Sequence, residues 1–196
     1  TGTSNDGAVA IGYQAGTYNQ GDNAIAIGSG AGGTLGLLAS SNPGTTGQGE
    51  GAIAIGYLAG SVNQGEYSVA IGYQAGYTGQ GDYSVAMGRE AGQYNQWNGS
   101  VAIGHKAGKT GQGGILAVSS AVAIGNQAGE CYQGQGSIAI GHRAGNTGTG
   151  ITGQGDGSIA IGIQAGESNQ AENAVAIGNQ AGQTGQGSGS IAIGYQ

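Results

Sequence analysis

Ala8-Val9-Ala10-Ile11-Gly12 is the stretch that decides the fold, because close copies of it recur along the whole chain. Most consecutive copies are 16 residues apart. A short fixed period of this kind is typical of a solenoid, in which each repeat forms one coil. Counted by the closing glycine, the eleven copies end at Gly12, Gly28, Gly56, Gly72, Gly88, Gly104, Gly125, Gly141, Gly162, Gly178 and Gly194.

Large and small residues alternate within each copy. Val or Ile lies three residues before the closing glycine and Ile, or once Met87, directly before it, with Ala or Ser between and ahead of them. Alternation with a period of two predicts a short β-strand with two different faces. We therefore predict an all-β fold, a β-solenoid of about eleven 16-residue coils; a 32-residue coil with two similar sides is the alternative.

The two strand faces have different expected roles. The Val and Ile side chains are expected to fill the thin interior, which leaves the Ala face outside; the reverse arrangement, with Ala inside, is the alternative. Repeated small residues suit close packing against another chain, and association would help to offset the entropy lost on ordering so many glycines. The sequence therefore predicts an oligomer.

The repeats form a single domain over residues 1–196, with insertions near 33–45, 115–119 and 149–153. The sequence starts and stops inside the repeat, and neither end carries a polar capping segment. Because a solenoid needs caps to protect its terminal strands, the chain is expected to be a fragment of a longer array.

One glutamine recurs in every complete unit, within a second and weaker strand. Stacked one coil apart, at about 4.8 Å, the amides could hydrogen-bond along the axis as a ladder. The residues just before glutamine alternate between Thr-Gly and Asn or Tyr, which adds a 32-residue period. The predicted ladder consists of Gln20, Gln48, Gln64, Gln80, Gln96, Gln112, Gln133, Gln154, Gln170 and Gln186.

Composition excludes several classes of protein. The net charge is −6 with only four basic residues, so the chain offers no surface that could follow a phosphate backbone, and nucleic acid is not an expected partner. The one cysteine cannot form an intrachain disulfide or a cysteine-built zinc site. No apolar run approaches the roughly 20 residues needed to span a bilayer, so membrane insertion by this segment is not expected.

Ser-Val-Ala-Ile-Gly-x-x-Ala, found at Ser68–Ala75 and Ser100–Ala107, resembles the YadA-like head repeat of trimeric autotransporter adhesins. Similar Ala-Ile-Gly-Tyr-Gln-Ala-Gly arrays resemble repeats in fibre-like proteins of viruses and phages. The resemblance implies a left-handed parallel β-roll that trimerises side by side on a cell or virion surface. The unit here is longer than the usual head repeat and carries the added glutamine.

No arrangement of residues indicates catalysis, a cofactor or a metal. Seven of the ten acidic residues lie six positions before a closing glycine; calcium could bridge them, but a solvated acidic edge is the expected role. His105-Lys106 and His142-Arg143 lie on variable corners without a fixed nucleophile beside them. The chain is therefore not expected to be an enzyme.

The candidate binding patch is an aromatic group around the most divergent unit. Exposed aromatic side chains can stack on sugars or anchor a protein. The candidate residues are Tyr67, Tyr83, Arg89, Tyr94 and Trp97.

The expected function is that of an extracellular fibre segment, structural or adhesive, that displays weak sites many times on a rigid rod. A glycan or another cell-surface receptor would be its partner. A purely structural, self-assembling filament or sheath subunit is the alternative. An ice-binding solenoid is disfavoured, because the ladder threonines recur only every 32 residues.

Overall fold

The computed structural model describes residues 6–33, 47–113, 120–146 and 153–196, so the predicted insertions lie almost entirely outside the described residues. Within these ranges every regular element is a three-residue strand, and there is no helix. The strands are β1 (Val9–Ile11), β2 (Ile25–Ile27), β3 (Ile53–Ile55), β4 (Val62–Gln64), β5 (Val69–Ile71), β6 (Thr78–Gln80), β7 (Val85–Met87), β8 (Tyr94–Gln96), β9 (Val101–Ile103), β10 (Val122–Ile124), β11 (Ile138–Ile140), β12 (Ile159–Ile161), β13 (Val175–Ile177) and β14 (Ile191–Ile193).

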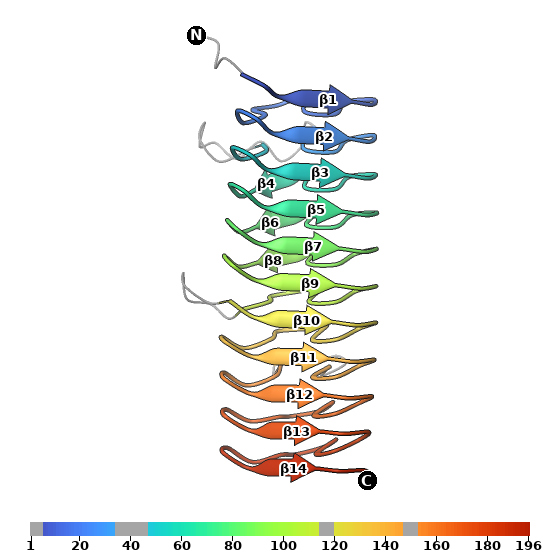
Figure 1. Ribbon diagram of the computed structural model, residues 1–196, viewed down its shortest axis with the longest axis vertical. Coiled ribbons are helices and arrows are strands. Elements are labelled where there is room, and N and C mark those ends of the chain that lie inside the picture. The colour runs from blue at the N-terminus through green and yellow to red at the C-terminus, as the bar shows by residue number, and fades with distance from the viewer. Residues whose placement is uncertain (1–5, 34–46, 114–119, 147–152) are drawn as a thin grey trace.

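The strands stack into a left-handed solenoid. Eleven of them form one parallel sheet in the order β1-β2-β3-β5-β7-β9-β10-β11-β12-β13-β14, and β4-β6-β8 form a second sheet. Figure 1 shows the long sheet at the front with every strand pointing right, and the chain returning behind it as it descends. Val9 pairs with Ile25, 16 residues on, so the predicted 16-residue coil is confirmed and the 32-residue coil is wrong.

The closing glycine of each coil has two reasons to be glycine. Its φ is near +130°, as at Gly72, a region that residues with a Cβ rarely adopt. A Cβ on Gly72 would also lie 2.6 Å from the carbonyl oxygen of Gly88 in the next coil. The strand therefore ends at a residue that both turns the chain and lets successive coils approach closely.

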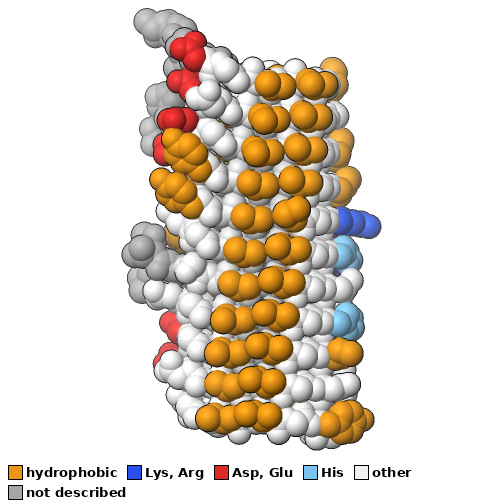
Figure 2. All heavy atoms as spheres, viewed as in Figure 1, with side chains coloured by type: hydrophobic (Ala, Val, Ile, Leu, Met, Phe, Trp, Pro, Cys, Tyr) orange, Lys and Arg blue, Asp and Glu red, His pale blue; other side chains and the backbone are white. Residues whose placement is uncertain are grey.

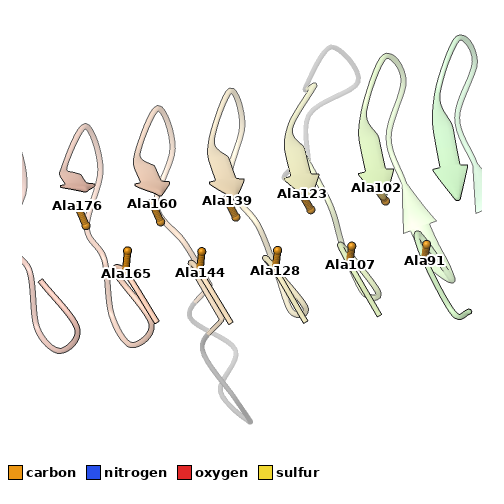
Figure 3. Close-up of a cluster of buried hydrophobic side chains, with 10 residues drawn as sticks. All are labelled: Ala91, Ala102, Ala107, Ala123, Ala128, Ala139, Ala144, Ala160, Ala165 and Ala176. Carbon is orange, nitrogen blue, oxygen red and sulfur yellow. The ribbon is translucent and has the colours of Figure 1, made fainter. Parts of the chain in front are cut away.

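Alanine fills the interior. Apart from Leu58 and Val62, every buried hydrophobic residue of the described ranges is Ala. Figure 3 shows two facing rows: Ala102 and its equivalents from the front strands meet Ala107 and its equivalents from the corners. The expectation that Val and Ile fill the interior is therefore wrong. The front strand and the opposing corner lie too close together to enclose a side chain as long as isoleucine.

The glutamines span this narrow interior from the opposite side. Nε2 of the buried Gln112 donates to the carbonyl oxygens of Val101 at 2.6 Å and Ala121 at 3.1 Å. All ten predicted ladder glutamines donate to a front-strand carbonyl in this way. Amide-to-amide bonds along the axis join fewer of them, as from Gln154 to Gln170 at 3.2 Å. The stack therefore ties the back of each coil mainly to its front.

The 32-residue alternation has a steric cause. The residue before each ladder glutamine adopts a positive φ in most coils, which favours Asn or Gly: Asn95 has φ +54° and Gly79 has φ +68°. A Cβ on Gly79 would lie 3.1 Å from Oδ1 of Asn95, and one on Gly111 would lie 3.0 Å from the ring of Tyr132. The side chain of Asn95 or Tyr132 thus occupies the space that a side chain at the same position of the preceding coil would need. Larger residues therefore alternate with glycine at this position.

Candidate functional site

A continuous apolar stripe covers the front sheet. The residues one and three positions before each closing glycine point outward, and none of them is buried. Figure 2 shows them as two parallel orange columns that run the length of the solenoid. We call these two columns the Val/Ile stripe. Exposed apolar patches of this extent mark contact surfaces on soluble proteins.

Charge is divided between the two long edges of the front sheet. The edge that leads into the strands, which we call the acidic edge, carries Asp6, Asp22, Glu50, Glu66, Asp82, Asp156 and Glu172 and no basic residue. The opposite edge, formed by the corners after the closing glycines, carries all four basic residues together with Glu90, Glu130 and Glu167. We call it the basic edge. Figure 2 shows red side chains at one edge, and blue and pale blue ones at the other.

Carboxylates of the acidic edge have a structural role. Oδ1 of Asp82 accepts from the backbone nitrogen of Glu66 at 3.0 Å, and Oδ1 of Asp156 accepts from that of Gln135 at 2.8 Å. Each such bond joins one coil to the coil before it. Within the described ranges, no three His, Cys, Asp or Glu side chains converge as metal ligands would.

Two tyrosines stack on the acidic edge. Tyr67 and Tyr83 have ring centroids 5.7 Å apart and are 48% and 66% exposed. Their φ values of +52° and +56° fall at a position held by glycine in six other coils. The Tyr67 hydroxyl donates to Glu50 at 2.7 Å, and this bond to a carboxylate raises the pKa of Tyr67. The backbone of the half-buried Trp97 lies beside Gly81, on the same edge.

The basic edge carries a second tyrosine stack. Tyr57 and Tyr73 have centroids 5.3 Å apart, and the Arg89 guanidinium lies over the Tyr73 ring at 5.7 Å. Arg89 and Lys109 both pair with Glu90, at 3.1 and 2.7 Å. Aromatic rings and cations therefore lie in one line on this edge.

The five candidate residues do not form one patch. Tyr67, Tyr83 and Trp97 lie on the acidic edge, whereas Arg89 lies on the basic edge. Tyr94 lies in β8 of the second sheet, edge-on to Tyr77. Sequence reasoning missed Tyr57 and Tyr73. Their common position, directly after a closing glycine as for Arg89, is the signal that could have grouped them.

A pH titration tests the charge network of the basic edge. The Lys109 ammonium donates a hydrogen bond to Glu90 and holds the pKa of that carboxyl below its usual value. We expect the Glu90 carboxyl to titrate in NMR below about 4.3, and Lys109→Met to raise its midpoint. The stabilisation from this pair is complete above the unfolded pKa and disappears as the pH falls through the folded pKa. A Glu90 midpoint at or above about 4.3 would contradict this account.

Among the described residues, the side chain in contact with the His105 ring is an amide. Nδ1 of His105 lies 3.3 Å from the amide nitrogen of Asn126, and an amide cannot act as a nucleophile for acyl or phosphoryl transfer.

The described chain contains no helix that is long and apolar enough to cross a membrane.

The profile of the YadA head domain repeat matches two segments, residues 4–31 and 48–75. These are YadA-type head repeats. Searches of the curated proteins and of the solved structures found no match. The first matched segment contains β1 and β2, the second contains β3, β4 and β5, and the later coils continue the same register through β14.

The YadA-type repeat builds the heads of trimeric autotransporter adhesins, a non-enzymatic family that bacteria display on their surface. This repeat type agrees with the surfaces described above, a long contact face with two exposed edges.

Proposed function

We propose that this chain is a rigid segment of an extracellular fibre, on a cell or virion, in which three copies pack side by side through the Val/Ile stripe. The observation that carries the proposal is the stripe itself: a sheet with apolar side chains outward along all eleven front strands. Burying these side chains between chains would stabilise the assembly by about 25 cal/mol for each Å² of apolar surface removed from water.

Three copies suit the geometry of the stripe. A closed ring of parallel chains buries the same face on every copy and leaves no copy of that face open. Since the stripe has two columns, each chain can present one column to each of two neighbours. The YadA-type repeat supports the same arrangement, because the adhesins that carry it are trimers.

Adhesion is the role proposed for the edges. Packing through the front sheet leaves residues at the outer edges and on the second sheet available to a receptor. Three parallel chains would repeat any site three times, and such repetition raises the effective affinity of weak contacts. A receptor that is a glycan or another cell-surface molecule fits this geometry.

Two isoleucines in one coil provide a matched test of the stripe. Ile161 belongs to the stripe, whereas Ile163 is 50% exposed on the corner two residues later. Ile161→Lys places an ammonium in the proposed apolar interface and is expected to raise the dissociation constant of the oligomer by at least about 100-fold. Ile163→Lys is expected to leave it within about threefold of the unmodified chain.

Sedimentation velocity across a concentration series measures both variants. Circular dichroism spectra equal to that of the unmodified chain would show that both lysines leave the solenoid folded. If Ile161→Lys keeps the same mass as Ile163→Lys at every concentration, the stripe is not the interface. An open-ended series of lengths would instead favour the self-assembling filament.

A further inference from the structure

Four planar side chains follow one another along the basic edge. Tyr57, Tyr73, Arg89 and His105 each come directly after a closing glycine in four successive coils, and we call them the planar column. Backbone bonds of 2.9 Å from Gln74 to Tyr57, and from Glu90 to Tyr73, keep these corners in register. The column therefore repeats about every 4.8 Å along a straight axis.

The outer atoms of the planar column are hydrogen-bond donors. Tyr57 and Tyr73 are 48% and 46% exposed and carry phenol hydroxyls, and the Arg89 side chain is 65% exposed. The Asn126 amide nitrogen lies 3.3 Å from Nδ1 of His105, and the tautomer that fits a donating amide there carries its ring proton on Nε2. A ligand that presents acceptors at regular intervals therefore matches this column.

Charge selects an anionic ligand for this edge. Glu90 is held by Arg89 and Lys109, and Glu167 pairs with Arg143 at 2.8 Å, so two of the three carboxylates on this edge are paired with a basic side chain. The third, Glu130, accepts hydrogen bonds from the amides of Gln127 and Asn146. Lys106, next to His105, takes part in no ion pair among the described residues. Seven carboxylates on the acidic edge repel a polyanion, which leaves the basic edge as the surface such a polymer can approach.

We propose that the planar column binds an acidic polysaccharide that lies parallel to the solenoid axis. This inference rests on the adhesive part of the proposed function and names its ligand class. An extended pyranose chain advances by about one coil per sugar, so successive rings can meet successive members of the column. Carboxylate or sulfate groups accept from Arg89 and Lys106, and sugar hydroxyls accept from the tyrosines.

Single-stranded nucleic acid fits the column less well. Proteins bind it by stacking bases on exposed aromatic faces. Here Tyr57 and Tyr73 already stack on each other, and Arg89 covers the Tyr73 ring. The ring edges and hydroxyls remain for a ligand, which favours a sugar chain over a base.

Binding of the full chain to a ten-sugar oligogalacturonate, measured by calorimetry, tests the proposal. Arg89→Gln removes the guanidinium and leaves Glu90 paired with Lys109, and it is expected to weaken binding by about tenfold or more. The pair Tyr57→Ala with Tyr73→Ala is expected to weaken it by a similar factor. Tyr67→Ala with Tyr83→Ala removes an equivalent stack from the acidic edge and is expected to change affinity by less than about twofold.

Four outcomes would overturn the proposal: no binding of the oligogalacturonate, equal binding of a neutral galactose decamer, tighter binding of a ten-nucleotide DNA strand, or equal loss in the acidic-edge variants. Sedimentation of the same samples separates this inference from the proposed assembly. If the chain is a trimer that does not bind the oligogalacturonate, only the proposed ligand of the planar column is contradicted. If the chain is a monomer that binds it, only the proposed trimer is contradicted.

Discussion

Gly72→Ala is expected to lower the free energy of unfolding by more than about 4 kcal/mol, or to prevent folding of the central coils. Gly72 has φ +130°, and its added Cβ would lie 2.6 Å from the carbonyl oxygen of Gly88 and 2.8 Å from the carbonyl carbon. Both are backbone atoms of Gly88, which directly follows a strand of the front sheet. The clash therefore cannot be relieved by rotating a side chain. Urea denaturation followed by circular dichroism measures the loss.

Gly194→Ala separates the two causes. Gly194 is also a closing glycine, with φ +131°, but a Cβ there meets nothing within 4 Å. We expect this variant to lose only the cost of the backbone conformation, about 1–2 kcal/mol. Equal destabilisation by the two substitutions would mean that coil-to-coil approach is not what requires glycine at this position.

Gln112→Glu is the second substitution with a large expected effect. Gln112 is fully buried, and its amide nitrogen donates to two carbonyl oxygens. A carboxylate there would place a charge and an acceptor against those oxygens. At pH 7 we expect a loss of about 3–5 kcal/mol in the free energy of unfolding, because a buried polar group without its partners is costly and a buried charge more so.

The pH dependence identifies the cause. Burial would raise the pKa of the new carboxyl in the folded state, so the part of the penalty that comes from its charge is absent below the unfolded pKa of about 4.3 and is complete once the pH has risen through the folded pKa. Gln135→Glu is the matched control, since Gln135 is exposed at a position where sister coils carry Asp or Glu. Urea midpoints at pH 4 and pH 7 that change equally in both variants would contradict the role of Gln112 as an internal tie.

The coil length was predictable because the chemistry of each turn repeats in the sequence. A closing glycine with positive φ, a variable pair and Ala-Gly mark every corner, and parallel pairing of Val9 with Ile25 then follows from the 16-residue spacing. The recurring glutamine was also visible, but its partners were not. That it bonds mainly to front-strand carbonyls depends on the distance between the two sides of the coil, which no spacing in the sequence reports.

The orientation of the front strand was not predictable from alternation alone. A period of two shows that Ala26 and Ile27 face opposite ways, but either could be inside. The thickness of the coil decides it. A Cβ on Gly76 would overlap Oε1 of Gln80 and lie 3.3 Å from the methyl of Ala70, so one glutamine and small side chains already fill the cross-section of the coil. Isoleucine therefore points outward.

The candidate binding residues do not lie together, for a related reason. Tyr83 and Arg89 are six residues apart in the chain, yet they lie at opposite edges because a strand separates them. In a solenoid, residues at the same offset from the closing glycine are neighbours, as Tyr57 and Tyr73 are. Grouping by offset would have found both tyrosine stacks.

The most direct test of the central claim is the mass of the unmodified chain in dilute solution, measured by multi-angle light scattering over a range of concentrations. Assembly through the Val/Ile stripe predicts a single species at three times the chain mass of 18.8 kDa. A species that stays at 18.8 kDa at every concentration would show that the exposed stripe does not join chains, and would contradict the proposed side-by-side fibre.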